Sequence, residues 1–126
     1  MTIAEVSKKY DITPDTLRYY EKIGLLSNVP RSASGIRNYD EKSCRWIEFV
    51  KCMRSAGVEI GILIKYMALL EKGKSTVEAR KQLLEEQRNK LIEKQNSINQ
   101  TLTRLNYKIE LYNEIVEGKR KDFTED

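Results

Sequence analysis

One stretch of this sequence gathers side chains that suit binding to phosphate groups. The segment TPDTLRYYEKIGLL, residues 13–26, brings Arg18, Tyr19 and Lys22 together within two helical turns, and a segment with further arginines follows it. Arginine binds phosphates and base edges through a planar fork of donors, and a tyrosine hydroxyl can donate to a phosphate oxygen. These residue types indicate a polyanion as a candidate partner.

Thiol chemistry is limited to two cysteines, Cys44 and Cys52, and the chain has no histidine. A thiolate can act as a nucleophile, but without histidine a His-based catalytic or zinc site is excluded. The cysteines stand eight positions apart on one expected helix, about 12 Å by helical rise, so they cannot form a disulfide within the chain. No phosphate-binding loop of G-x-x-x-x-G-K type is present. We therefore expect no enzyme activity, no metal and no cofactor.

The N-terminal region is expected to form two short helices joined by a tight turn. The capping box TIAE, residues 2–5, starts a helix that runs to about residue 10. After a turn at residues 11–12, the pair Thr13-Pro14 restarts a helix as N-cap and first helical residue, and Gly24 ends it. Such a pair predicts a helix-turn-helix.

Three further elements complete the N-terminal part. Residues 25–39 are expected to form a small β-hairpin or loop with a turn at residues 33–35, where serine and glycine gather. Asp40 caps a third helix that ends at Gly57, and a fourth helix spans residues 59–72. The fold class is therefore mainly α, with a small hairpin.

The longest predicted helix, residues 75–117, carries an apolar stripe with a seven-residue repeat. Its expected start is the capping box STVE, residues 75–78. A helix of this length is roughly 63 Å long, and it needs a partner helix to bury the stripe. Because the chain has no other long helix, we expect the partner to be a second copy. The stripe consists of Val77, Leu84, Leu91, Ile98, Leu105 and Tyr112, joined late by Leu102, Ile109 and Val116.

Helical geometry assigns different roles to the neighbouring tyrosines of the second helix. At about 100° per residue, Tyr20 shares a packing face with Leu17, whereas Tyr19 shares an outward face with Arg18 and Lys22. On the third helix the same construction places Cys52 just past the margin of the apolar arc and Cys44 on the polar face. Lys51 and Arg54 are near Cys52 in sequence and could lower its pKa.

Composition is compatible with a nucleic-acid partner. The net charge is +4, and residues 1–72 contribute +3 of it, from 12 basic and 9 acidic side chains. No apolar run reaches the roughly 20 residues that span a bilayer, so we expect a cytoplasmic protein with no membrane contact. An alternative in another class is a coiled-coil adaptor whose small N-terminal part contacts a different protein.

The sequence resembles the MerR family of bacterial transcription regulators along essentially its whole length. The matching segments are TIAEVSKKYDITPDTLRYYEKIGLL, SASGIRNYDE and IEFVKCMRSAGVEIGIL, in the family's order. The resemblance implies a winged helix-turn-helix at residues 1–72, a dimerisation helix at 73–118 that forms an antiparallel coiled coil, and a flexible tail at 119–126. It also implies binding as a homodimer to a near-palindromic promoter operator in double-stranded DNA, distortion of that DNA, and contact with RNA polymerase.

Family DNA contacts can be carried over position by position. They fall on the second helix, on the wing and, at one position, on the third helix: Thr13, Thr16, Arg18, Tyr19, Tyr20 and Lys22; Arg31, Ser34, Arg37 and Tyr39; and Arg54. An excisionase-type architectural factor shares the winged motif, but the long helix argues against it.

The resemblance is closest to a group of short members with one cysteine on the third helix, which respond to aldehydes or other electrophiles (NmlR/AdhR-like). Cys52, in EFVKCMRSAG, matches that cysteine and is the expected sensor. Metal sensing is disfavoured because no cysteine follows Cys52. Two alternatives remain open: Cys52 is only a small semi-buried hydrophobic residue, and the chain is a DNA-binding regulator without thiol sensing.

Overall fold

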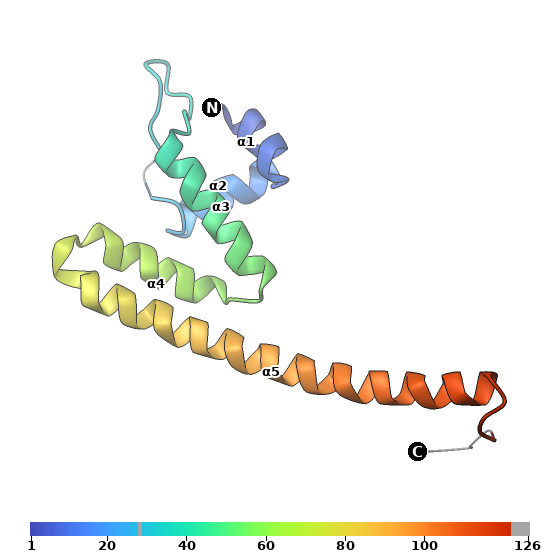
Figure 1. The fold of residues 1–126 in the computed structure, drawn as a ribbon. Coiled ribbons are helices and arrows are strands. Elements are labelled where there is room, and N and C mark those ends of the chain that lie inside the picture. Colours follow the sequence, from blue (N-terminus) through green and yellow to red (C-terminus); the bar gives the residue numbers. More distant parts are fainter. Residues whose placement is uncertain (28, 122–126) are drawn as a thin grey trace. The chain divides into compact units, whose positions relative to one another are not determined.

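The computed structural model describes residues 1–27 and 29–121, and this part of the chain contains five α-helices and one 3-10 helix (Figure 1). Its residues form two compact units, Met1–Gln87 and Arg88–Asp126. The functional division predicted at residues 1–72, 73–118 and 119–126 stays a prediction. Residues 122–126 of the expected flexible tail lie outside the described residues.

Helices α1 (Ile3–Tyr10) and α2 (Pro14–Lys22) begin at the predicted caps. In the capping box, the Thr2 hydroxyl accepts from the Glu5 amide at 3.1 Å, and the Glu5 carboxylate accepts from the Thr2 amide at 2.9 Å. The hydrogen bonds from Thr2 lower the pKa of the Glu5 carboxyl. The Thr13 hydroxyl accepts from the Thr16 amide at 3.2 Å. The predicted starts of both helices are confirmed.

The turn between these helices depends on one left-handed residue. Asp11 has a φ of 53°, and Ile12 donates its amide to the Ser7 carbonyl at 3.1 Å. A short polar side chain such as aspartate tolerates this conformation better than most. The chain therefore turns between Tyr10 and Pro14, and α1 packs against α2.

Helix α3 (Glu41–Ser55) begins at the predicted cap Asp40 and has apolar contacts on more than one face. Its buried residues Cys44, Ile47 and Val50 include two members of the core around α1 and α2. Trp46 and Phe49 instead stack with Tyr66 of α4 (Ile60–Glu71). The prediction that Cys44 lies on a polar face is wrong, because α3 packs against neighbours on both sides.

One cluster of buried side chains joins α1, α2, α3 and the segment between the second and third helices. The indole N–H of Trp46 adds a polar contact by donating to the Leu25 carbonyl at 2.7 Å. This cluster holds α2 and the following loop in one body. Its members are Val6, Tyr10, Leu17, Leu26, Val29, Tyr39, Cys44 and Ile47.

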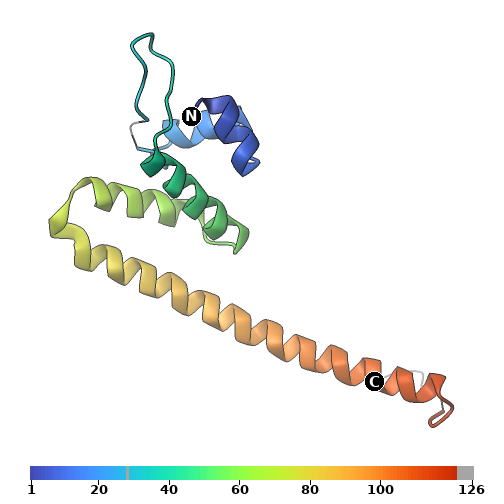
Figure 2. The ribbon, with the colours of Figure 1, turned by 45° about the horizontal axis from the view of Figure 1, so that its top comes forward.

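The expected β-hairpin is not formed as strands within the described residues. A loop projects from the helices between α2 and α3, as Figures 1 and 2 show, and an isolated antiparallel bridge between Arg31 and Arg37 closes it. Asn38 donates its amide to the Pro30 carbonyl at 2.7 Å, but proline has no N–H to return the bond. The next amide along, that of Tyr39, donates to the Met1 carbonyl instead, so the ladder stops after one rung. We call residues 30–38 the wing.

The turn at the tip of the wing is confirmed. Gly35 has a φ of 83°, which suits glycine, and donates its amide to the Ser32 carbonyl at 2.9 Å.

The start of the long helix differs from the prediction. The 3-10 helix η1 (Lys74–Thr76) leads into α5 (Val77–Val116), in place of a capping box at Ser75. The Thr76 hydroxyl contacts the carbonyls of Leu69 at 2.6 Å and Gly73 at 2.8 Å, and the Arg80 guanidinium contacts Thr76 and Gly73. One of the last carbonyls of α4, that of Leu69, is thereby satisfied.

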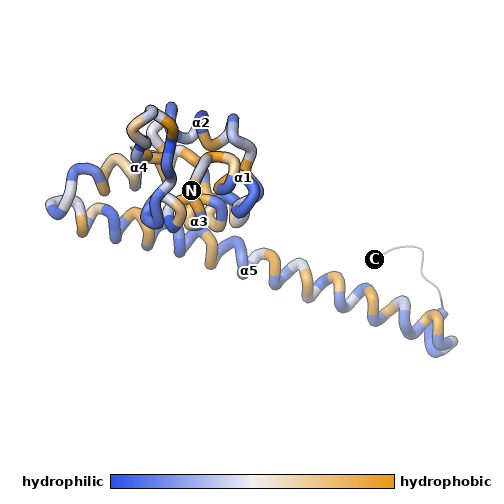
Figure 3. Tube along the Cα trace, turned by 90° about the horizontal axis from the view of Figure 1, so that it is seen from above, coloured by the Kyte–Doolittle hydropathy of each residue, from blue (hydrophilic) through white to orange (hydrophobic). Residues whose placement is uncertain are grey.

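Helix α5 exposes its predicted apolar stripe. Hydrophobic positions recur along its whole length in Figure 3. The buried Leu83 lies on a different face, one residue from the stripe position Leu84. Exposed fractions between 40 and 55 % are found at Val77, Leu84, Ile98, Leu102, Leu105, Ile109 and Tyr112, and Leu91 is half-buried. Among the described residues no helix is both long and apolar enough to cross a membrane.

Candidate nucleic-acid interface

The outward face of α2 is formed as helical geometry predicts. Leu17 is fully buried and Tyr20 packs at the edge of the core, whereas Tyr19 keeps 55 % of its surface exposed. Arg18 and Lys22 are also exposed. The two neighbouring tyrosines therefore have separate roles, and α2 presents two basic side chains and one phenol on a single face.

The N-terminus of α2 adds hydroxyl groups to this face. The side-chain oxygens of Thr13 and Thr16 lie 2.8 Å apart, and Thr13 is exposed. Arg18 contacts Asp15 at 3.0 Å, with both side chains open to solvent. Exposed ion pairs of this kind contribute about 0.2–1 kcal/mol, so Arg18 can exchange Asp15 for a stronger anion.

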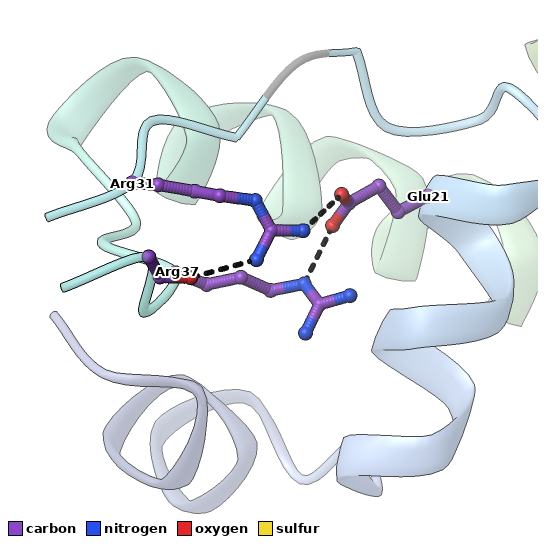
Figure 4. Close-up of polar contacts among 4 residues, drawn as sticks. Glu21, Arg31 and Arg37 are labelled. Carbon is purple, nitrogen blue, oxygen red and sulfur yellow. Dashed lines mark hydrogen bonds and ion pairs between the residues drawn. The ribbon is translucent and has the colours of Figure 1, made fainter.

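The wing is joined to α2 by two arginines that share one carboxylate (Figure 4). Arg37 donates from Nε to one oxygen of Glu21 at 2.8 Å, and Arg31 donates from Nη2 to the other at 3.4 Å. Arg31 also donates from Nη1 to the Gly35 carbonyl at 3.0 Å across the loop. The hydrogen bond to Glu21 raises the pKa of Arg37. Two predicted contact residues are thus brought beside the outward face of α2.

Sequence reasoning missed Glu21. It is separated from Arg31 and Arg37 by 10 and 16 positions, so helical spacing cannot pair it with either. Glu21 is one of two acidic residues in residues 13–26, and the one available signal is that two arginines after it flank a glycine turn.

Two other predicted DNA contacts, Ser34 and Arg54, lie in different places in the structure. Ser34 is exposed at the tip, with its hydroxyl 3.0 Å from that of Ser32. Arg54 lies at the C-terminal end of α3, where its guanidinium donates to the Val58 carbonyl at 2.7 Å. This contact fixes the connection from α3 to α4, and it gives Arg54 a structural role.

Tyr39 does not present its side chain as the family pattern implied. The residue is 1 % exposed, and its hydroxyl has no hydrogen-bond partner in the described residues. Burial raises the pKa of this phenol. The DNA contact predicted for Tyr39 stays a prediction; in this structure core packing covers the ring and keeps the hydroxyl from the surface.

Cys44 is more buried than predicted, and Cys52 is more exposed than predicted. Cys44 is buried, with its sulfur 3.8 Å from that of Met1, and Cys52 is exposed rather than at a core margin. The basic neighbours of Cys52 point elsewhere, since Lys51 donates to the Tyr10 carbonyl and Arg54 to the Val58 carbonyl. Cys52 is therefore the accessible thiol of the two.

Comparison with known proteins identifies the architecture. The family described as MerR HTH family regulatory protein matches residues 1–70. The chain belongs to the MerR family. The regulator AdhR of Bacillus subtilis is 55 % identical over 80 residues, which cover 64 % of this chain and 57 % of AdhR. The match thus spans little more than half of that relative. An uncharacterised HTH-type transcriptional regulator of Haemophilus influenzae is 29 % identical over 90 % of this chain and 84 % of its own length.

Solved structures of MerR-family proteins share the fold. A transcriptional regulator from Listeria monocytogenes matches with a TM-score of 0.86 and 42 % identity, over 90 % of this chain and 86 % of its own. HiNmlR, a MerR family regulator that lacks the sensor domain and is bound to promoter DNA, matches with a TM-score of 0.79 and 30 % identity, over 92 % of each chain. These relatives are transcription regulators, not enzymes.

Proposed function

We propose that this MerR-family chain is a dimeric, sequence-specific regulator that binds a near-palindromic promoter operator. The observation that carries the proposal is the outward face of α2, where Arg18, Tyr19 and Lys22 lie beside wing arginines held by Glu21. Basic and hydroxyl side chains on a recognition helix suit contacts to phosphates and base edges. The promoter-bound relative HiNmlR supports the same use of the fold. Such a regulator would act in the cytoplasm.

The proposed dimer forms through α5. The stripe side chains of this helix are about half exposed in the single chain, and full burial of one large aliphatic side chain contributes roughly 1.5–3 kcal/mol. An antiparallel coiled coil of two copies would cover the stripe and give the dimer two recognition helices. Two-fold symmetry in the protein then requires two-fold symmetry in the operator.

The regulator is further proposed to distort its operator and thereby change how RNA polymerase reads the promoter. A dimer with fixed spacing between two recognition helices can impose that spacing on DNA, at a deformation cost that depends on the sequence between the half-sites. Footprinting with a probe of base unstacking at the operator centre, with and without polymerase, would test this step.

Operator binding is tested by comparing charged residues on and off the proposed interface. Arg18→Ala should weaken operator binding strongly, and Lys22→Ala should lower the slope of log affinity against log salt by about 1. Lys90→Ala, an equal loss of charge on exposed α5, should change neither. If Arg18→Ala leaves operator affinity unchanged, the recognition-helix assignment is wrong. Binding that is salt-labile and blind to sequence would instead favour an adaptor with incidental DNA affinity.

The proposed signal is an electrophile that reacts with Cys52. The exposed thiol supports this choice, because the other cysteine is buried in the core around α1 and α2. In the reaction with an aldehyde, the sulfur bonds to the carbonyl carbon and the thiol proton ends on the oxygen, which gives a hemithioacetal. The neighbouring Lys51 side chain contacts the end of α1, so an adduct at Cys52 lies one residue from a contact that helps hold the helix-turn-helix.

Intact-mass analysis separates the two thiols. After exposure to an aldehyde or a quinone, wild type and Cys44→Ser should gain one adduct, and Cys52→Ser should gain none. The promoter response should follow the same pattern. A normal response from Cys52→Ser would end the sensor proposal and leave the proposal of operator binding intact.

A further inference from the structure

Glu21 is one of two acidic residues on α2, and unlike the solvent-exposed Asp15 it directs its carboxylate toward the wing. Its side chain is 23 % exposed, and each of its carboxylate oxygens accepts from a different wing arginine. Electrostatics alone would disfavour a carboxylate close to DNA phosphates. The presence of a carboxylate at this position therefore needs an explanation other than attraction to DNA.

The two wing arginines use their nitrogens differently. Arg31 is engaged at both terminal nitrogens, by the Gly35 carbonyl and by Glu21. Arg37 contacts Glu21 through Nε, and within the described residues its Nη1 and Nη2 have no hydrogen-bond partner. Arg31 therefore closes the loop and ties it to α2, and Arg37 keeps a two-pronged donor available.

The wing has little backbone structure of its own to hold these side chains. Apart from the single bridge between Arg31 and Arg37, the order of the wing depends on its contacts to Glu21, on hydrogen bonds at its turn and on the N-terminal ammonium of Met1, which donates to Asn38 Oδ1 at 3.1 Å. A long arginine side chain loses much rotamer freedom when it is fixed. If the side chain is already fixed before DNA binds, this loss of conformational entropy does not weaken the binding.

We propose that Glu21 is a positioning residue that presets Arg37 for a DNA phosphate, with Arg31 as the tie that keeps the wing against α2. The proposal rests on the proposed function and deepens it. Arg37 would meet the phosphate through Nη1 and Nη2 and keep its Nε bond to Glu21, so one guanidinium would contact the recognition helix and the DNA together. Glu21 itself does not touch DNA.

This role is tested by whether operator affinity rises or falls when a negative charge is removed from α2. Glu21→Gln and Asp15→Asn both remove one negative charge from α2 with little change in shape, and Asp15 is almost fully exposed beside Arg18. If charge alone matters, both variants should bind operator as well as or better than wild type. Positioning predicts that Glu21→Gln weakens operator binding by roughly ten-fold, or about 1.4 kcal/mol, and that Asp15→Asn does not.

A double-mutant cycle identifies the residue through which Glu21 acts. Arg37→Ala should weaken operator binding and lower the salt slope by about 1. In the Arg37→Ala background, Glu21→Gln should cause no further loss, because the group that it positions is gone. Additive losses would overturn the proposal, and so would an operator affinity of Glu21→Gln equal to or above that of Asp15→Asn.

Two controls keep folding and function apart. Arg37→Lys keeps the charge and leaves Glu21 intact, but it has no fork that reaches Glu21 and a phosphate together, so it should lose nearly as much affinity as Arg37→Ala. Full operator affinity in Arg37→Lys would overturn the proposal even if Glu21→Gln folds poorly. Wild-type selectivity for its footprinted operator over scrambled DNA is measured first. Absence of selectivity contradicts the proposed function, whereas selectivity with an unaffected Glu21→Gln contradicts only the role of Glu21.

Discussion

The two compact units treat the same apolar residue types in opposite ways. In Met1–Gln87, side chains such as Val6, Leu17 and Leu25 are completely buried. Beyond Gln87, most large apolar side chains of α5 are about half exposed, with Leu111 as a buried exception. The first unit therefore buries a core of its own, although its part of α5 still exposes Val77 and Leu84, and most large apolar side chains of the second unit have no cover within the chain.

Polar contacts follow the same division. In the first unit, long side chains bind distant backbone groups, as Lys51 does with the Tyr10 carbonyl and Trp46 with the Leu25 carbonyl. In α5 beyond Gln87, the hydroxyls of Thr101 and Thr103 bond only to carbonyls one turn back. Contacts between distant segments make a unit stable alone, whereas contacts within one helix leave its faces open to a partner.

The largest expected effect comes from a charge on the α5 stripe. Ile98→Glu should abolish the dimer, because it would place a carboxylate in an apolar seam, and operator binding should fall by at least about a hundred-fold when two half-sites are no longer linked. Sedimentation equilibrium and gel shift measure the two effects. Gln100→Glu, on the opposite face of the helix, should remain dimeric. A dimeric Ile98→Glu would contradict the division between the units.

The next largest effect is expected from a cavity in the core of the first unit, which should lower the stability of the fold. Leu17→Ala should lower the free energy of unfolding by roughly 2–5 kcal/mol, because Leu17 is fully buried and its truncation removes apolar contacts and leaves a cavity. Tyr19→Ala, on the exposed face of the same helix, should cost less than about 0.5 kcal/mol. Urea titration at fixed protein concentration compares them. Equal losses would mean that α2 is not a two-faced helix.

The buried Tyr39 hydroxyl offers a change in the other direction. Tyr39→Phe removes a polar atom that has no hydrogen-bond partner in the described residues, so the free energy of unfolding should rise by about 1 kcal/mol. Operator affinity should stay the same if the ring remains in the core. A loss of affinity with unchanged stability would restore Tyr39 as a DNA contact and show that the loop opens on binding.

The smallest expected effect is the acid sensitivity of a helix cap. Hydrogen bonds from Ser43 lower the pKa of the Asp40 carboxyl. A carboxyl with a lowered folded-state pKa stabilises the fold above its ordinary pKa, and that stabilisation is lost as pH falls through the folded value. Asp40→Asn keeps a capping oxygen without the titration. Between neutral pH and about pH 3, this variant should lose slightly less thermal stability than wild type. An identical loss would mean that the cap does not titrate.

Most of the helices could be predicted from local sequence signals. The starts at Thr2, Thr13 and Asp40 are caps whose hydrogen bonds reach only three residues along the chain. The split between Tyr19 and Tyr20 follows from helical periodicity alone. Caps and periodicity involve residues only a few positions apart, so the sequence of one chain is sufficient to predict them.

The wing, the cysteines and the start of α5 could not be predicted in the same way. Strand pairing in the wing failed because Pro30 cannot donate and because Tyr39 bonds to Met1, a residue 38 positions away. The cysteine environments were reversed because α3 packs on two faces, which one helical arc cannot describe. The α5 start depends on Thr76 and Arg80, which bind the end of the preceding helix.

By itself, the sequence determined the order of the helices, the outward face of α2 and the repeating stripe of α5. These features depend on intervals of three, four and seven residues, which the α-helix fixes. Only the tertiary structure decided that Glu21 of α2 binds Arg31 and Arg37, that Tyr39 is buried and that Cys52 is the exposed thiol. The physical reason is that each of these depends on which distant segments pack together, and periodicity along one helix carries no information about its neighbours.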